Sequence, residues 1–205
     1  MFIAELFSRP RWFAAAALVV VFSICAHEFM HAYVALKQGD PTAADAGHLT
    51  MNPFRQMGWW SLIMLALLGI AWGQVPVNPD NLRTRKARVA VALAGVAANL
   101  ALAVIFAGLC ALTLRMAREN GFAVSVLLYA SAINLVLAAI NLFPVPGFDG
   151  WNVLREFWQP SSVSETVNGA FFIMLMLLFF CIDYIQTGAG YAAIFLVRLL
   201  SGGGK

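Results

Sequence analysis

The decapeptide SICAHEFMHA, residues 23–32, places two histidines and one glutamate inside a strongly apolar run of the sequence. This run extends from about Trp12 to Leu36 without a proline or glycine, so we expect it to form one uninterrupted helix. Its length exceeds the about 20 residues that a helix needs to cross a bilayer. Ionisable side chains are costly in hydrocarbon and generally serve a function there. The decapeptide therefore predicts a functional site within the membrane.

The composition of the whole chain also indicates a membrane protein. Of the 205 residues, 61% are hydrophobic and 11% are charged, whereas soluble domains carry about 25% charged residues. The net charge is only +3, and the basic residues gather in short clusters between apolar runs. That distribution is typical of membrane loops and not of nucleic-acid binding. The lipid bilayer is therefore an expected partner, and nucleic acid is not.

The apolar runs predict an all-α membrane protein, a polytopic helical bundle with about 5–6 membrane segments. No linker or repeat divides the chain, so we expect one integral-membrane domain over residues 1–205, with its functional core at about 12–158. The predicted segments are 12–36, 57–72, 89–114, 122–143, 170–185 and 191–200, the last being either an interfacial piece or the end of a final helix.

The segment 57–72 differs from the others because its 16 residues are short for a span and a proline-rich stretch follows it. We expect it to be short or re-entrant. The connection between Gly39 and Pro79 contains several turn signals. It predicts a small β element after the first span that offers an edge strand to an extended substrate, with plain loops as the alternative.

Within the decapeptide, His27 and His31 lie four residues apart and so share one face of the predicted helix. Zinc accepts imidazole nitrogen readily, and Glu28 lies next to the first histidine, where it can take a proton from an activated water. The spacing is that of the H-E-x-x-H motif of metalloproteases. The alternative is that these polar groups join helices by hydrogen bonds, with Glu28 as an ion-pair partner.

A catalytic zinc site needs a third protein ligand, and Asp149 is the candidate. It lies in NLFPVPGFDG, residues 141–150, where two prolines interrupt an apolar span. Irregular backbone at membrane depth is tolerated where it faces protein or a wet cavity. We expect Gly150 to allow unusual backbone angles beside the carboxylate. The third histidine, His48, lies in a polar connection and is not assigned to the site.

HEFMH at 27–31 and N-x-x-P-x-P-x-x-D-G at 141–150 together resemble the site-2 protease family of zinc intramembrane metalloproteases. The stretches at 39–43, 48–53 and 76–79 resemble the short bacterial branch of that family. The resemblance implies one Zn²⁺ per chain held by His27, His31 and Asp149, with Glu28 as the catalytic base. It also implies that Asn141 holds the substrate backbone or the developing oxyanion.

The chain departs from the family pattern in one middle span. Where relatives often show Ala-Gly-Pro-x-x-Asn, this chain reads AGVAAN at residues 94–99 and lacks the proline. A substrate or oxyanion role for Asn99 is one interpretation. In the other, Gly95 allows close helix packing and Asn99 bonds a neighbouring helix.

The function implied is that of a zinc-dependent intramembrane endopeptidase, which hydrolyses peptide bonds of transmembrane or membrane-associated protein substrates. The alternative is a membrane scaffold that binds zinc without turnover, or a metal transporter. An inactive scaffold would bind metal but be indifferent to the loss of Glu28. A transporter would show metal flux and would not need a carboxylate next to the first histidine.

Zinc ligands must lie at one depth, which constrains the topology. The first span and the span before Asp149 must run in the same direction, so residues 57–72 cannot cross the membrane fully. The following basic residues then share one side: Lys37, Arg55, Arg83, Arg85, Lys86, Arg88 and Arg155, with Arg9, Arg11, Arg115 and Arg118 opposite. Positive residues favour the cytoplasm. We therefore expect a multi-pass protein of the bacterial cytoplasmic membrane with its site toward the cytoplasmic half.

Overall fold

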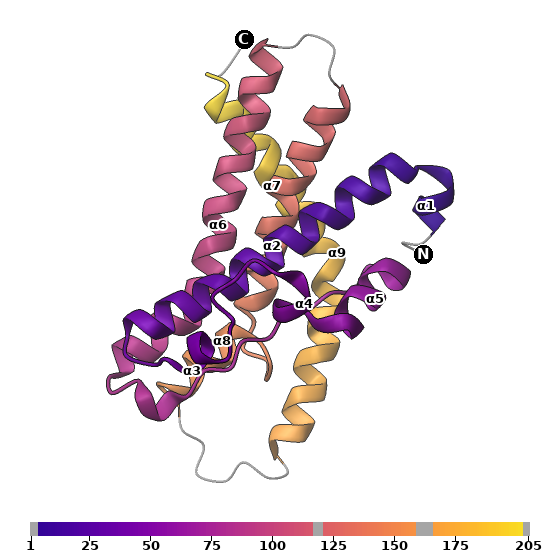
Figure 1. Ribbon diagram of the computed structural model, residues 1–205. Coiled ribbons are helices and arrows are strands. Elements are labelled where there is room, and N and C mark those ends of the chain that lie inside the picture. The colour runs from indigo at the N-terminus through magenta and orange to yellow at the C-terminus, as the bar shows by residue number, and fades with distance from the viewer. Residues whose placement is uncertain (1–3, 117–120, 159–165, 203–205) are drawn as a thin grey trace.

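The computed structural model describes residues 4–116, 121–158 and 166–202, and long helices dominate it (Figure 1). The long helices are α2 (Pro10–Lys37), α6 (Arg85–Met116), α7 (Gly121–Asn141) and α9 (Thr166–Leu200). Four helical segments of the described part are long and apolar enough to cross a membrane: Pro10–Lys37, Arg85–Met116, Gly121–Asn141 and Phe180–Leu200. The prediction of a helical membrane protein is confirmed.

Short elements connect the long helices. They are α1 (Ala4–Ser8), α3 (Thr42–Asp45), α4 (Pro53–Gln56), α5 (Gly58–Leu68), the 3₁₀-helix η1 (Pro79–Asn81) and α8 (Asp149–Arg155). The apolar residues after 57 form α5, whose 11 residues extend over only about 16 Å. That is roughly half of the hydrocarbon thickness of a bilayer. The helix ends at Gly69, which has a φ of 77°, a left-handed conformation that glycine adopts readily.

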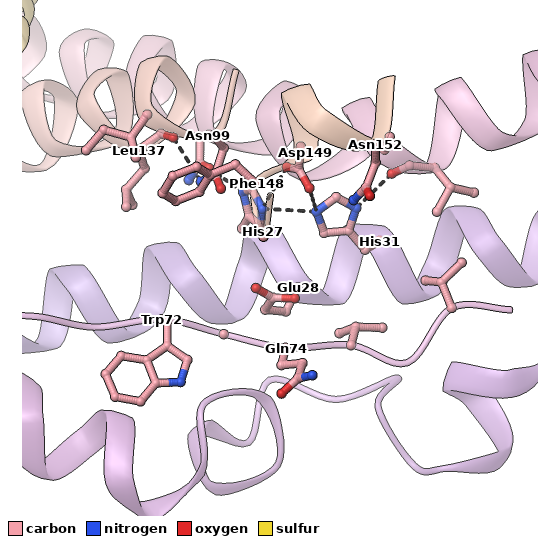
Figure 2. Close-up of a pocket in the computed structure, with 18 of the residues that line it drawn as sticks. His27, Glu28, His31, Trp72, Gln74, Asn99, Leu137, Phe148, Asp149 and Asn152 are labelled. Atoms are coloured by element: carbon pink, nitrogen blue, oxygen red, sulfur yellow. Dashed lines mark hydrogen bonds and ion pairs between the residues drawn. The ribbon is translucent and has the colours of Figure 1, made fainter. Parts of the chain in front are cut away.

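The β element expected after the first span is not seen, and this prediction is wrong. Between α2 and α6, all residues of which the structure describes, the chain forms only short helices and irregular segments. Residues 70–78 run alongside α2 as an irregular, extended segment (Figure 2). Its one backbone hydrogen bond to a neighbouring segment is from Gln74 N–H to the Gln56 carbonyl, at 3.0 Å. Pro76 has no N–H, so a regular ladder cannot continue along the segment.

The last two predicted segments form one helix, α9, so Tyr191–Leu200 completes the final helix. Helix α6 packs closely on α7 and α9 because small residues occupy the interface. Ala107 of α6 is fully buried, and Cys110 and Ala111 pack with Val197 of α9 in one apolar cluster. Small side chains let helix backbones approach one another, which favours association of helices in a membrane.

Buried polar side chains gather where α2 meets the first half of α6, among them His27, His31 and Asn99. Apolar clusters lie on either side of this crossing: Val20, Ile24, Cys25, Met57 and Leu65 on one side, and Ala35, Leu82, Ala87 and Val91 on the other. Helix α8 lies close by (Figure 1), and Glu156, which directly follows it, forms an ion pair with Arg88 of α6, with 2.7 Å between Arg88 Nε and Glu156 Oε2. This arrangement brings residue 149 to the α2–α6 crossing.

Candidate metal centre

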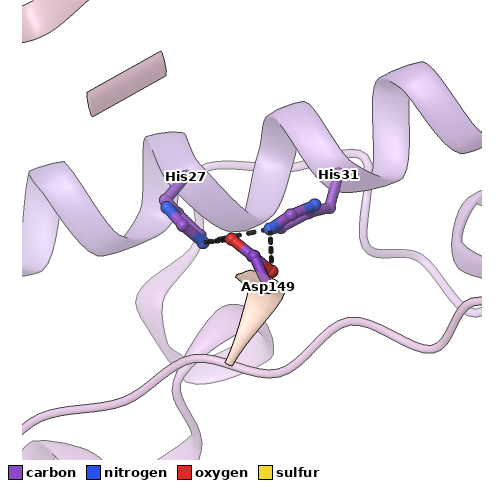
Figure 3. Close-up of side chains that lie close together, drawn as sticks. All are labelled: His27, His31 and Asp149. Carbon is purple, nitrogen blue, oxygen red and sulfur yellow. Dashed lines mark hydrogen bonds and ion pairs between the residues drawn. The ribbon is translucent and has the colours of Figure 1, made fainter. Parts of the chain in front are cut away.

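His27, His31 and Asp149 converge at the crossing of α2, α6 and α8 (Figure 3). The two Nε2 atoms lie 3.0 Å apart. Asp149 Oδ2 lies 3.2 Å from His27 Nε2, and Oδ1 lies 3.2 Å from His31 Nε2. All three residues are buried, with 5–8% of their surface exposed. Within the described part of the chain, these residues form the one group of three or more potential ligands whose donor atoms converge within 4.8 Å.

The spacing of these atoms suits a zinc ion. Zinc binds imidazole nitrogen and carboxylate oxygen at about 2.0–2.2 Å, so two ligands of a tetrahedral ion lie about 3.3 Å apart. The nitrogen–nitrogen and nitrogen–oxygen distances of 3.0 and 3.2 Å come close to this value. Asp149 Oδ2 is buried without a hydrogen-bond partner in the described residues, an arrangement that is costly unless a cation satisfies the oxygen. The donor set therefore fits the metal.

The second nitrogen of each histidine is already engaged. His27 Nδ1 lies 2.6 Å from Asn99 Oδ1, and His31 Nδ1 lies 2.7 Å from the Val91 carbonyl oxygen. Both oxygens accept hydrogen bonds, so each Nδ1 carries the proton and each Nε2 presents a lone pair. Two lone pairs at 3.0 Å repel unless a cation lies between them. Such outer partners are typical of metal-binding histidines.

Gly95 of α6 leaves the space that a metal needs. A Cβ atom at this position would collide with Nε2 of both His27 and His31. The glycine backbone thus forms one wall of the space between the two nitrogens. This agrees with the interpretation of Gly95 as a site of close approach, although here the neighbours are the histidine rings.

Asp149 reaches the site through a turn between α7 and α8. Helix α7 ends at Asn141, and Gly147, with a φ of 97°, turns the chain so that Asp149 begins α8. The expectation that Gly150 adopts unusual backbone angles is wrong, because its φ is not positive. Its role is close approach, since a Cβ there would collide with the carbonyl oxygens of Leu142 and Phe143. The chain thereby packs back on itself and places the carboxylate.

Glu28 lies on the side of α2 that faces the extended segment (Figure 2). Its side chain is 8% exposed and accepts no hydrogen bond from the described residues. Gly73 lies so close that a Cβ there would collide with the carboxyl group of Glu28. Both residues line a cavity of about 720 Å³ that also reaches His27, His31 and Asp149. The carboxylate is therefore held beside the candidate ligands and within the same cavity.

The two asparagines of the predicted site lie differently. Asn141 lines the cavity at the end of α7 and donates a hydrogen bond of 3.0 Å to the Leu137 carbonyl of its own helix. Asn99 is fully buried, accepts from His27 and donates to Asn134 Oδ1 at 2.9 Å. Of the two interpretations of Asn99, the bond to a neighbouring helix is the one that this geometry favours. His48 is not part of the group of candidate ligands, and its Nδ1 lies 3.2 Å from Gln56 Oε1.

Several residues that position the site have no recognisable motif. Asn134 and Ser23 lie in apolar spans, where a polar side chain by itself indicates a bonding partner or a function. Asp40 is fully buried and accepts hydrogen bonds from Asn78 N at 2.8 Å and Asn81 Nδ2 at 2.8 Å, so it fixes the far end of the extended segment. Gly73, which packs against the carboxyl group of Glu28, is the fourth residue of this kind. These contacts join residues far apart in the sequence.

Comparison with known proteins agrees with this geometry. The profile of peptidase family M50 matches residues 15–116 and 110–181. "Putative zinc metalloprotease YwhC" of Bacillus subtilis (strain 168) is 32% identical over 172 residues, which cover 78% of each chain. "Putative zinc metalloprotease Rip2" of Mycolicibacterium smegmatis is 30% identical over 186 residues, which cover 83% of this chain and 70% of the relative. No solved structure matches the chain significantly.

Proposed function

The chain belongs to peptidase family M50, the site-2 protease family, and is a zinc metalloprotease; we propose that it cleaves peptide bonds within the membrane-spanning segments of its protein substrates. The observation that carries this proposal is the place of the candidate site. His27, Glu28 and His31 all belong to α2, one of the helices long and apolar enough to cross a membrane. A metal centre built on that helix serves a substrate that is itself embedded in the membrane.

We assign one zinc ion per chain to His27, His31 and Asp149. Their Nε2 and carboxylate atoms have suitable spacing, and the Nδ1 partners leave both Nε2 lone pairs available. A zinc ion held by these residues would supply an activated water and polarise the carbonyl group of the substrate. Glu28 is the base that takes the proton of the attacking water and later delivers it to the leaving amine.

The extended segment supports a substrate in an extended conformation. The N–H groups of Trp72, Gln74 and Asn78 bond to Ser61, Gln56 and Asp40. The N–H groups of Gly73, Val75 and Val77 have no hydrogen bond among the described residues. Successive backbone groups of an extended chain point in opposite directions, so these unpaired groups face away from the anchored side. A substrate that has unwound from its helix can pair with them.

Asn141 is the residue we assign to the substrate carbonyl or the developing oxyanion. It lines the cavity with Glu28 and Asp149. Only one amide hydrogen is needed for its bond to the Leu137 carbonyl, so the second remains to donate to an oxygen in the cavity. A donor that stabilises an oxyanion is worth about 10²–10³ in rate.

We place the metal centre in the cytoplasmic half of a bacterial membrane. The basic residues at the start of α6 lie on the same side as the end of α2, because Val91 of α6 bonds His31 of α2. Lys86 in this cluster is exposed. In Lys86→Cys, a membrane-impermeant thiol reagent should label the protein from the cytoplasmic face. Labelling from the outer face alone would contradict this orientation.

The proposed activity is tested with the purified protein in liposomes and synthetic single-span peptides that carry glycine and asparagine in the middle of an apolar stretch. Wild-type protein with zinc should cleave a peptide within the stretch, at a bond identified by mass spectrometry. Glu28→Gln should lose at least about 100-fold in rate, the lower end of what a general base contributes. It should retain zinc, because Glu28 is not among the proposed ligands.

Three outcomes would overturn the proposal. Cleavage only of water-soluble unfolded chains would contradict membrane-embedded substrates. Full activity of Glu28→Gln would contradict the base. Zinc binding without cleavage of any peptide in the set, together with zinc flux across the liposome membrane, would instead indicate a transporter.

A further inference from the structure

A chain of hydrogen bonds leads from His27 through α6 to α7. His27 Nδ1 lies 2.6 Å from Asn99 Oδ1, and Asn99 Nδ2 donates to Asn134 Oδ1 at 2.9 Å. Asn134 Nδ2 donates in turn to the Ala130 carbonyl at 2.8 Å and to Ser23 Oγ of α2 at 2.9 Å. Asn99, Asn134 and Ser23 are fully buried. Water therefore cannot reach these side chains to substitute for a missing hydrogen-bond partner.

The last bond of the chain fixes the direction of all the others. The Ala130 carbonyl can only accept a hydrogen bond, so the amide nitrogen of Asn134 must face it. The amide oxygen of Asn134 then faces Asn99 and can only accept, so Asn99 must present its nitrogen there. This leaves the oxygen of Asn99 for His27, whose Nδ1 must carry the proton. Each orientation follows from the one before it.

We propose that Asn134 is a positioning residue of the metal centre, which holds Asn99 in the orientation that keeps the Nε2 lone pair of His27 free for zinc. The inference rests on the proposed role of His27 as a zinc ligand. Without the Asn134 oxygen, the buried nitrogen of Asn99 has no acceptor and can exchange places with its oxygen. The nitrogen would then donate to His27 Nδ1, which moves the ring proton to Nε2 and blocks the metal.

The second histidine shows why such a chain is needed for the first. His31 Nδ1 donates directly to the Val91 carbonyl, a backbone group that cannot turn over. His27 instead meets a side-chain amide whose two ends can be exchanged. An amide needs a further partner to define its orientation, and Asn134 supplies it. A role in packing alone would not require a polar residue at this position, because apolar side chains fill membrane interiors at lower cost.

The experiment compares the zinc affinity of Asn134→Leu and Asn134→Asp, measured on purified protein by competition with a chelator of known affinity. Leucine removes the acceptor for Asn99, so affinity should fall by about 10- to 100-fold, as for other outer partners of metal ligands. Aspartic acid keeps an acceptor oxygen, and in its buried protonated form it also donates to Ala130. Its affinity should stay within about threefold of the wild type.

This order is opposite to that expected of a packing residue, for which leucine is the benign change and aspartate the costly one. The matched control is Ser131→Ala, since Ser131 is also fully buried in α7 and bonds the Ala103 carbonyl of α6 at 2.9 Å, outside the chain. It should leave zinc affinity unchanged. A loss in Ser131→Ala as large as that in Asn134→Leu would mean that any loosening of α6 and α7 weakens the metal, and would overturn the inference.

The variant His27→Ala distinguishes a failure of this inference from a failure of the proposed zinc site. If His27→Ala loses zinc while Asn134→Leu binds zinc as tightly as wild type, Asn134 does not orient the metal ligand through Asn99, and the assignment of the metal centre is unaffected. If His27→Ala binds zinc as wild type does, the assignment of the metal centre itself is wrong, and so is the role proposed for Asn134.

Discussion

The cavity has two walls that are built in contrasting ways. The helical wall consists of His27, His31 and Asp149, with Gly95 packed against both histidine rings, and each histidine is oriented through Nδ1 by an acceptor on α6. The extended wall consists of residues 72–77, and the backbone groups of its alternate residues have no partner in the described structure. Both walls line the same cavity of about 720 Å³.

The difference agrees with the roles proposed for the two walls. A metal site needs ligands whose orientation is set before the ion arrives, since loosely held ligands lose affinity. A site for an extended peptide instead needs backbone groups that remain unpaired until the peptide supplies the partners. Changes to the helical wall should therefore affect zinc, and changes to the extended wall should affect turnover or local stability while zinc remains.

The largest expected effect is that of Gly95→Ala in the helical wall. The added methyl group would collide with Nε2 of both histidines, whose rings cannot move without losing their Nδ1 partners. Overpacking costs up to about 3 kcal/mol, which is a factor of about 100 in zinc affinity. Chelator competition measures the loss. Gly188→Ala in α9 is the control, because a Cβ there meets nothing within 4 Å. Undiminished zinc affinity in Gly95→Ala would refute this view of the helical wall.

The matching change in the extended wall is Gly73→Ala. Its methyl group would collide with the carboxyl group of Glu28, a flexible side chain that can swing aside. Zinc affinity should stay within about twofold, while kcat on the single-span peptide should fall by about 10-fold or more because the base is displaced. Equal losses of zinc in Gly73→Ala and Gly95→Ala would show that the two walls are not separable.

A smaller effect is expected from Asp40→Asn, which alters the anchor of the extended wall. Asp40 accepts from Asn78 N at 2.8 Å, from Asn81 Nδ2 at 2.8 Å and from both the backbone N–H and the hydroxyl of Thr42. An amide at this position turns two N–H groups toward existing donors. The change should lower the free energy of unfolding by about 2 kcal/mol and lower Tm in detergent. Zinc affinity should be unchanged, and its loss would show that the anchor also supports the helical wall.

The same carboxylate predicts a pH dependence. Burial by itself raises the pKa of Asp40, but hydrogen bonds from Asn81, Thr42 and Asn78 outweigh it and hold that pKa below its ordinary value. The unfolded chain binds the proton more readily, with a pKa of about 3.9. The stabilisation is therefore complete above about pH 4 and is lost as the pH falls through the lower, folded-state pKa. The Tm difference between wild type and Asp40→Asn should shrink over this acidic range; a constant difference would contradict the prediction.

The smallest effect should come from Ser61→Ala at the near end of the extended wall. Ser61 Oγ donates to the Trp72 carbonyl at 2.6 Å and accepts from Trp72 N–H at 2.9 Å. Their loss should cost about 1 kcal/mol of stability, visible in Tm with little effect on zinc. Ser125→Ala is the control, since Ser125 is exposed and bonds only the Gly121 carbonyl of its own helix. A similar Tm change in both variants would remove any special role from Ser61.

The helical wall was largely predictable and the extended wall was not. The spacing of His27 and His31 follows from helical geometry, and the apolar surroundings already indicated a site. The third candidate, Asp149, was visible because prolines and glycines mark its turn. In contrast, residues 72–77 follow no hydrophobic period, and distant partners such as Asp40 fix their course. Local pattern therefore suggested a β element, whereas tertiary hydrogen bonds to single side chains left an unpaired segment.

The chain of hydrogen bonds from His27 through Asn99 to Asn134 could not be predicted for the same reason. A polar residue within an apolar span shows that a partner exists but does not identify it. Asn99 and Asn134 lie 35 residues apart on different helices, and Ser23 lies 111 residues from Asn134. Only the packing of α2, α6 and α7 brings them together. The motif residues were thus apparent from the sequence, and the residues that orient them were not.

The attachment of the metal centre to three helices has a mechanical consequence. Helix α2 carries both histidines, α6 holds their Nδ1 atoms and α8 supplies the carboxylate. Pulling any two of these helices apart would break contacts of about 3 Å and scatter the ligands. These three helices must therefore keep their relative positions for the candidate ligands to stay together. In the proposed reaction, a substrate would therefore enter on the side of α5 and the extended wall, which contribute none of the candidate ligands and none of their Nδ1 partners.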